Sequence, residues 1–386
     1  MIDQSYLDWP FFEDHHRRLA VELESWCCEY LDEQIDHSDT DKACLEILSR
    51  LAEGGWLKYT VPKAYGGVFD QLDVRSLCLI RETLARHDGL ADFVFAMQGL
   101  GSGSISLFAS DNIKQHYLTA VASGKKVAAF ALTELESGSD VANMSTKAVD
   151  MGDHYLINGA KTFISNGGIA DYYTLFARTG EAPGAKGISA MIIDADTEGL
   201  EIKERIEVIA PHPLATITFN NCKVSKDKLL GVAGAGFKIA MATLDIFRTT
   251  VGAAALGFSR RALCDALQRT KDRQLFGAPL HDLQLVQAML GESALDIDTS
   301  ALLIYRAGWT RDTQGKRVTR EAAMAKLHAT ETAQRVIDKA IQIFGGMGVV
   351  KGVKVEQLYR EVRALRIYEG ATEVQKIIIA KQLLAM

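Results

Sequence analysis

Apolar side chains recur at helical spacing through the first third of the chain. Residues 15–34 and 41–53 each carry them about three or four positions apart, and the stretches 71–88 and 111–123 repeat the pattern. Glycine, proline and polar residues separate these stretches. We therefore predict an N-terminal α-helical domain over residues 1–128.

The pattern changes over residues 129–235, where short apolar runs are separated by turn residues. Residues 155–157 and 161–165 flank Asn158-Gly159, a pair that fits a type I′ turn, and so predict a β-hairpin. Spaced runs of this kind indicate a middle β-domain, built as a small β-sandwich or barrel. The other predicted strands lie at 172–177, 188–194, 202–209 and 216–224.

Residues 236–386 return to long helical patterns. The stretches 282–313 and 318–344 contain no proline and almost no glycine. Helices of this length pack best as antiparallel neighbours in a bundle. The order helix, strand, helix therefore predicts an α+β multidomain protein that is mostly α, and it argues against a Rossmann unit, in which strands and helices alternate.

The composition argues against several classes of partner. The 386 residues carry a net charge of -6, so no basic face for a nucleic acid is expected. The six cysteines are scattered without a C-x-x-C pair, which indicates reduced thiols and a cytoplasmic location. The N-terminus has no secretory or transit pattern, and no run of 18 uncharged apolar residues predicts a membrane span.

Several common site motifs are missing from the sequence. It has no H-E-x-x-H, no Cys/His cluster and no G-x-S-x-G, so we expect no metal site and no serine nucleophile elbow. His15 and His16 would point about 100° apart on a helix and would not share a ligand. The glycines of residues 99–104 follow no strand, which favours packing or a roomy pocket wall over a nucleotide-binding loop.

Three loops combine polar groups with small residues, and each has an ordinary structural alternative. Residues 133–140 can bring hydroxyl and backbone donors to a polar ring, or form an interdomain loop. Residues 163–168 place an aromatic and a hydroxyl where a planar cofactor could lie, or simply end a strand. Residues 343–348 allow close approach of a ligand or another chain, or turn between helices.

Glu369 is the most specific candidate. It lies in a short loop between two apolar helices, near Leu365 and Ile367. Such surroundings raise the pKa of a carboxyl group, which suits a general base. Helix capping, or a plain surface acid, is the alternative that the local sequence favours.

Taken together and in order, these segments resemble the acyl-CoA dehydrogenase family over nearly the whole chain. Residues 133–140 resemble its T-E-P-G-A-G-S-D loop, and residues 158–167 resemble its N-G-x-K-x-x-I-T/S-N strand. The other matching positions are Pro62 with Tyr65-Gly66-Gly67, Gly231 with Gly236-Phe237, Leu244-Asp245 with Arg248, Arg273 with Phe276-Gly277, Leu280 and Gln284, Gln342 to Gly346, and Tyr368-Glu369-Gly370.

The resemblance implies the family fold: an N-terminal helical domain (1–128), a middle β-domain (129–235) and a C-terminal four-helix bundle (236–386). It also implies an FAD cofactor. The positions that match contacts to the flavin ring are Leu132, Thr133, Phe163 and Ser165. Those that match contacts from a neighbouring subunit are Arg273, Phe276, Gln284, Gln342, Gly345 and Gly346. We therefore expect a homodimer or homotetramer.

The reaction that the resemblance implies is dehydrogenation of an acyl-CoA thioester to the 2,3-enoyl thioester. Glu369 matches the base that removes the α-proton while the β-hydrogen leaves as hydride to flavin N5. The backbone N–H of the base and a flavin ribityl hydroxyl would stabilise the enolate oxygen. An electron-transferring flavoprotein would reoxidise the cofactor. Positions that match substrate contacts are Ser139, Asp245, Arg248, Tyr368 and Gly370.

Some positions depart from the family pattern. Leu135-Glu136 replaces Pro-Gly and adds charge near the expected thioester arm, and Phe163 replaces a Trp. Ala371 replaces a common Thr, and Phe247 stands where a minority of the family places the base. The small residues at 99–104 suggest room for a branched or cyclic acyl chain. The alternatives are an oxidase of this fold, a dehydrogenase of carrier-protein-bound acyl groups, and a non-catalytic flavoprotein.

Overall fold

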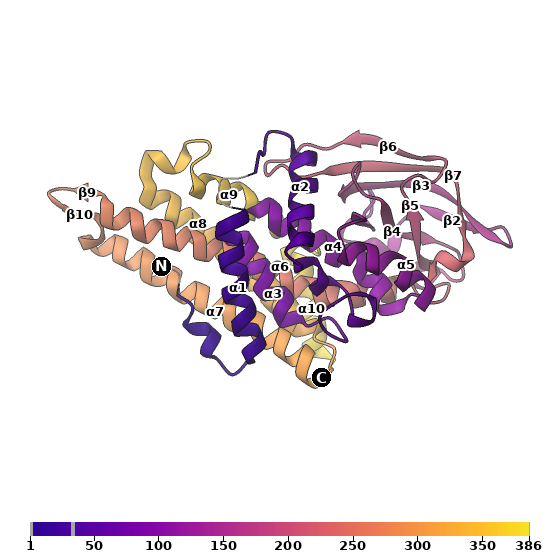
Figure 1. Ribbon diagram of the computed structural model, residues 1–386, viewed down its shortest axis with the longest axis horizontal. Helices are drawn as coiled ribbons and strands as arrows, with labels where there is room; N and C mark the ends of the chain where they lie inside the picture. Colours follow the sequence, from indigo (N-terminus) through magenta and orange to yellow (C-terminus); the bar gives the residue numbers. More distant parts are fainter. Residues whose placement is uncertain (1–2, 32–34, 386) are drawn as a thin grey trace. The chain divides into compact units, whose positions relative to one another are not determined.

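The computed structural model describes residues 3–31 and 35–385 (Figure 1). Helices precede and follow a central β-sheet along the chain, so the predicted fold class is confirmed. The chain forms two compact units. We name them the sheet unit, Ile35–Leu72 with Phe93–Phe247, and the helical unit, Met1–Gln34 with Asp73–Asp92 and Arg248–Met386. The predicted boundaries near residues 128 and 235 stay a prediction.

The sheet unit is built around one mixed eight-stranded sheet. The strands lie in the order β6-β7-β3-β2-β4-β5-β8, and β1 pairs with β4 outside this path. Strands β4 and β5 are buried along almost their whole length, which explains their continuous apolar runs. The bounds are α2 Thr40–Glu53, α5 Asp111–Ala122, β1 Ala128–Ala131, β2 Lys147–Asp150, β3 His154–Ser165, β4 Tyr172–Arg178, β5 Ile188–Asp194, β6 Leu200–Arg205, β7 Leu214–Ser225 and β8 Leu229–Leu230.

The β-hairpin predicted at Asn158-Gly159 is wrong. Strand β3 runs through both residues, and the turn lies earlier, at residues 151–153, between the antiparallel strands β2 and β3. Gly159 instead adjoins a register shift in the pairing of β3 with β7. A Cβ added to it would lie 2.7 Å from the Cα of Thr146. This glycine therefore permits close approach of two backbones and an irregularity in the strand.

The sequence pattern also does not predict helix α4 (Gly89–Phe108), because its glycines have low helix propensity. Packing explains them. A Cβ added to Gly99 or Gly103 would lie 2.7 Å from ring atoms of Phe247, and one added to Gly101 would lie 2.7 Å from the Cβ of Ala128. The Phe247 ring therefore occupies the space beside Gly99 and Gly103. These positions do not leave the room for an acyl chain that the sequence suggested.

Long helices lie side by side in the helical unit (Figure 1). Helices α7 and α8 are joined by a short link and contact each other, which confirms the predicted antiparallel pairing; α8 also contacts α9 and α10. Residues 32–34, at the end of the first predicted helix, lie outside the described residues. The bounds are α1 Asp14–Tyr30, α3 Val74–His87, α6 Gly236–Asp272, α7 Gln284–Gln314, α8 Thr319–Phe344, α9 Lys354–Leu365 and α10 Thr372–Leu384. The part of α6 before Arg248 belongs to the sheet unit.

Helix α6 is long and apolar enough, by length and composition alone, to cross a membrane. However, 89 % of its most apolar 18-residue window is buried, so these side chains serve packing within the protein. A buried carboxylate ties it to two neighbours. Glu82 on α3 lies 2.7 Å from Nε of Arg260 on α6 and accepts a hydrogen bond from the hydroxyl of Tyr305 on α7. Because a buried charge must be paired, this group fixes three helices against one another.

Candidate active site

Glu369 lies in the turn between α9 and α10, in the left-handed region at a φ of 52°. Its Oε2 is buried and has no hydrogen-bond partner within residues 3–31 and 35–385. Burial raises the pKa of Glu369, against the opposing effect of the positive charges of Arg81, Lys326 and Arg248. The predicted rise in this pKa is thereby confirmed. A buried, unpaired carboxylate of this kind is equipped to accept a proton.

The carbonyl groups of this turn are held by side chains from three helices. Nε of Arg248 (α6) donates to the Glu369 carbonyl at 3.0 Å. The Gly370 carbonyl accepts from Nζ of Lys326 (α8) at 2.7 Å and from Nε2 of Gln375 (α10) at 2.8 Å. In the described part of the chain, the N–H of Glu369 has no protein acceptor. In the described part of the chain, the turn therefore holds a carboxylate oxygen and an N–H donor that no protein group satisfies.

The cations around Glu369 act on its carboxylate without forming a direct ion pair. Arg81 places two nitrogens on the carboxylate of Asp92, at 2.7 and 2.8 Å, and a third on the hydroxyl of Thr250 at 3.1 Å. Among the described residues, no basic group lies within 4.0 Å of the Glu369 carboxylate oxygens. Arg81, Lys326 and Arg248 therefore lower the pKa of Glu369 through space rather than through a direct ion pair.

The predicted substrate contacts fall in both units. Tyr368, Gly370 and Arg248 lie with Glu369 in the helical unit, and Arg248 contacts the turn itself, which the sequence did not indicate. Ser139 is exposed and Asp245 is buried, and both lie in the sheet unit. Their roles toward a thioester stay predictions.

Four predicted flavin contacts lie along β3 and the loop beside it, in the sheet unit. The N–H of Thr162 donates to the carbonyl of Thr133 at 3.0 Å, which brings the loop against the strand. Phe163 has a φ of 53° and is 55 % exposed, whereas Leu132 is buried and Ser165 is half-buried. An exposed aromatic ring beside residues that carry hydroxyl groups suits a planar flavin. The residues present therefore fit FAD.

A buried ion pair fixes this loop, and sequence reasoning missed it. Nζ of Lys161 lies 2.8 Å from Glu134 and donates to the Leu132 carbonyl at 2.9 Å. Glu134 also accepts from the backbone N–H groups of Ser145 and Thr146. Burial opposes ionisation of Glu134, but the Lys161 charge and these hydrogen bonds hold its pKa at about 2. Both residues lie within the family-like segments, which was the available signal.

Leu135 and Glu136, the main departure from the family pattern, form the tip of a tight turn. Glu134 and Ser137 pair across its base. Leu135 is 78 % exposed and Glu136 is also exposed. The departure therefore leaves the buried pairing of Glu134 intact and changes only the surface of the loop.

The positions predicted to contact FAD from a neighbouring subunit lie on open surface of the helical unit. Phe276, between β9 (Gln274–Leu275) and β10 (Ala278–Pro279), is 90 % exposed. A Cβ added to Gly345 or Gly346 would meet no atom within 4 Å. Arg273 and Gln284 flank the β9–β10 hairpin, and Gln342 lies in the last turn of α8. Their contact with a cofactor or a second chain stays a prediction.

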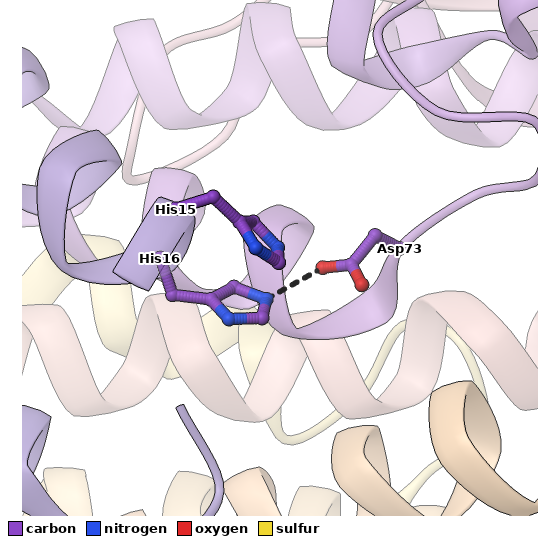
Figure 2. A group of neighbouring side chains, drawn as sticks. All are labelled: His15, His16 and Asp73. Carbon is purple, nitrogen blue, oxygen red and sulfur yellow. Dashed lines mark hydrogen bonds and ion pairs between the residues drawn. The ribbon is translucent and has the colours of Figure 1, made fainter. Parts of the chain in front are cut away.

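His15, His16 and Asp73 bring potential metal ligands within 4.8 Å of one another (Figure 2). The expectation that the two histidines point apart is wrong, because their ring centroids lie only 3.8 Å apart. Nδ1 of His16 accepts from the backbone N–H of Glu13 at 3.1 Å, which leaves Nε2 to donate to Asp73 at 3.0 Å. Arg75 adds a positive charge beside Asp73. The group is therefore explained by hydrogen bonds and ion pairs.

Comparison with known sequences matches three parts of the chain to one family. Residues 13–125 match the acyl-CoA dehydrogenase N-terminal domain, residues 129–222 the middle domain and residues 234–384 the C-terminal domain.

Similar proteins and structures cover almost the whole chain. The 3-(aryl)acrylate reductase of Clostridium sporogenes is 35 % identical and covers 97 % of this chain and 100 % of its own. The caffeyl-CoA reductase-Etf complex subunit CarC of Acetobacterium woodii is 37 % identical and covers 88 % of this chain and 89 % of its own. The structure of butyryl-CoA dehydrogenase from Megasphaera elsdenii is 32 % identical, covers 97 % and 99 % of the two chains, and superimposes with a TM-score of 0.90.

Proposed function

Since this chain belongs to the acyl-CoA dehydrogenase family, we propose that it catalyses the FAD-dependent α,β-dehydrogenation of an acyl-CoA thioester with Glu369 as the base. Membership makes it an FAD-dependent oxidoreductase. The observation that supports Glu369 is its Oε2, which is buried and unpaired within the described chain on a carboxyl group whose pKa is raised. A carboxylate of this kind is a stronger base than a solvated one.

Two groups of Glu369, its carboxylate and its backbone N–H, activate the substrate in this proposal. Oε2 of Glu369 takes the α-proton, and the N–H of Glu369 donates to the thioester oxygen, where negative charge develops. FAD, when bound, supplies the two-electron acceptor for the β-hydrogen, which leaves as hydride. Two C–H bonds break and the 2,3 double bond forms, while Glu369 keeps the proton. Thr133, Phe163 and Ser165 would hold the flavin ring.

We also propose an electron-transferring flavoprotein as the partner that reoxidises the cofactor. The support is that CarC, a relative over 88 % of this chain, is a subunit of a reductase–Etf complex. We further propose that the active unit is a homodimer or homotetramer. The support is the open surface at Phe276, Gly345 and Gly346, positions that the family resemblance assigns to contacts with the FAD of a neighbouring subunit.

The same site can work in the reducing direction as a second candidate function. Two similar proteins are named as reductases, one of a 3-(aryl)acrylate and one of caffeyl-CoA. By microscopic reversibility, a protonated Glu369 would deliver the α-proton to a 2,3-enoyl substrate. Since the pKa of Glu369 is raised, its protonated form is more populated than that of a solvated glutamate.

The test uses the purified protein reconstituted with FAD in the absence of oxygen. Saturated acyl-CoA esters that are straight, branched, cyclic and aryl-substituted are added one at a time, and we expect one class to bleach the flavin absorbance. Glu369→Gln should keep the colour and lose the bleaching. Glu22→Gln, which neutralises an exposed acid on α1, is the control and should bleach normally.

The outcomes separate the candidates. Bleaching by a saturated ester supports the dehydrogenase. A flavin that is first reduced chemically and then reoxidised only by a 2,3-enoyl ester supports the reductase. Rapid reoxidation by dioxygen with peroxide release favours an oxidase, and activity restricted to carrier-bound thioesters favours the carrier alternative. Normal bleaching of Glu369→Gln contradicts the assignment of the base.

A further inference from the structure

The turn that carries Glu369 has a backbone conformation that needs support. Glu369 is a non-glycine residue at a φ of 52°, and Gly370 follows at 97°. Such conformations are strained for residues with a side chain, and they persist where the surroundings hold them. A Cβ added to Gly370 would lie 2.5 Å from Nε2 of Gln375, so the support comes very close to the backbone.

Lys326 supplies part of this support from an unusual position. It lies on α8 with no exposed surface, and its Nζ donates to the carbonyl of Gly370 at 2.7 Å. No carboxylate among the described residues lies within 4.0 Å of Nζ. Burying an ammonium group is costly, and a neutral carbonyl offsets the cost less than a carboxylate does. A lysine used only for packing would be better replaced by an apolar residue of similar length.

Lys161 provides the internal comparison. It is equally buried, but its ammonium is paired with the carboxylate of Glu134 at 2.8 Å. Lys326 has no such partner, and its charge instead acts on Glu369 across the turn, where it opposes the rise in the pKa of the base. Burial lowers the pKa of Lys326 itself to about 8, against the raising effect of Glu369. The two groups therefore influence each other.

We propose that Lys326 and Gln375 are positioning residues for the base: together they clamp the Gly370 carbonyl, which holds the Glu369 backbone in its left-handed conformation and aims the carboxylate, while Lys326 keeps a positive charge near it. This inference rests on the proposed role of Glu369. Lys326 contributes geometry and charge, whereas the neutral Gln375 contributes geometry alone.

Other charges surround the same turn and set the background for any pH dependence. They are Arg81 on α3, Asp92 on α4, Arg248 on α6, Glu331 on α8 and Glu373 on α10. None of them changes in the variants below, so a shift between variants reports the residue that was replaced.

The experiment measures the rate of flavin bleaching by a saturating acyl-CoA ester against pH in the FAD-loaded enzyme. Lys326→Met removes the donor and the charge at similar length. We expect a rate roughly 10 to 100 times lower, because small displacements of a catalytic group cost that much. We also expect the apparent pKa of the bleaching rate to rise by about one unit, since a lost positive charge favours protonated Glu369. Lys326→Arg should restore most of both.

Gln375→Met removes only a hydrogen bond to the Gly370 carbonyl and no charge, so it tests the positioning role by itself. It should slow bleaching without changing the apparent pKa. Lys339→Met is the matched control: it removes a lysine of the same helix whose Nζ lies 2.8 Å from Glu292, and it should leave both quantities unchanged. Thermal unfolding of each variant shows whether the fold is kept. If Lys326→Met does not hold FAD, Gln375→Met and Lys326→Arg still decide the proposal through the rate.

Two results overturn the inference. One is a Lys326→Met or Gln375→Met enzyme with the wild-type rate and pH profile. The other is a loss of rate in Lys326→Met that Lys339→Met reproduces. The proposed function fails differently, through normal bleaching by Glu369→Gln. If Glu369→Gln does not bleach but Lys326→Met behaves as the wild type, only the positioning role is wrong.

Discussion

The buried pair of Lys161 and Glu134 supports the loop that carries Leu132, and its removal makes a quantitative prediction. Lys161→Met leaves the Glu134 carboxylate buried without a countercharge. Breaking a buried pair in this way costs about 3 to 5 kcal/mol. Because Glu134 keeps hydrogen bonds from Ser145 and Thr146, at 2.6 to 2.9 Å, we expect the lower end, roughly 3 kcal/mol.

The double variant Glu134→Gln/Lys161→Met distinguishes the charge from the packing. It removes both charges, so it should be less destabilised than Lys161→Met alone, by about 1 to 3 kcal/mol of coupling between the two sites. The assay is urea unfolding of the apoprotein followed by circular dichroism, with all variants compared at equal slope.

Lys161→Met should weaken FAD binding as well as lower the free energy of unfolding. Lys161 donates to the Leu132 carbonyl at 2.9 Å, so the loop loses a contact that holds it in place. We expect FAD to bind roughly 10 times more weakly to Lys161→Met, equivalent to about 1.4 kcal/mol. Titration of the apoprotein with FAD, followed by flavin fluorescence, measures this. A stability loss below about 1 kcal/mol, or a double variant equal to the sum of its singles, would refute the reasoning.

Three further predictions follow from packing and charge. Gly99→Ala should destabilise the protein by about 1 to 3 kcal/mol, because the new Cβ would lie 2.7 Å from the Phe247 ring. Gly291→Ala in α7 should instead stabilise the protein by about 0.5 to 1 kcal/mol, because no atom lies within 4 Å of the new Cβ and alanine favours a helix. Urea unfolding of both variants measures the difference. Burial and then the Asp88 charge raise the pKa of Glu361 from 4.5 to about 7, so the folded state binds a proton that the unfolded state lacks between these values, and the cost is fully present above pH 7. Glu361→Gln should therefore stabilise by about 1 kcal/mol at pH 8 and have little effect at pH 4, and an equal effect at both pH values would contradict this. Glu134 has a folded pKa near 2 and an ordinary value of 4.5, so its stabilisation is complete above pH 4.5 and is lost as the pH falls toward 2; acid unfolding of the wild type compared with Glu134→Gln tests the sign.

Hydrophobic periodicity was enough to predict the order of helices and strands, because the apolar residues of each element are spaced so that they form its buried face. It failed where a glycine serves a distant neighbour. Gly159 permits approach to Thr146, and Gly99 and Gly103 receive the ring of Phe247. In each case the partner lies far away in sequence, so local composition suggested a turn or an open pocket. A glycine in the sequence indicates that a side chain would not fit at that position, but it does not indicate which neighbouring atoms occupy the space.

At the candidate site, too, local features could be predicted from the sequence, whereas contacts between distant residues could not. The loop position of Glu369, its apolar neighbours and its raised pKa could be inferred from a short segment. The groups that hold it could not, because Arg248, Lys326 and Gln375 come from three helices, and the first lies 121 positions from the carbonyl that it binds. A family motif therefore identifies a residue expected to contact the ligand, such as Glu369, more readily than the distant residues that hold that residue in place.

The two buried lysines show why this matters for assigning function. In the sequence, Lys161 lies in a strand pattern and Lys326 in an alanine-rich helix, and neither position indicates a charge partner. The structure gives Lys161 a carboxylate and Lys326 a backbone carbonyl next to Glu369. A paired buried charge is explained by its partner, whereas a buried ammonium on a neutral carbonyl needs another reason for its cost. The nearby carboxylate supplies that reason, which is why Lys326 rather than Lys161 is the residue whose loss should change the pH dependence of the reaction.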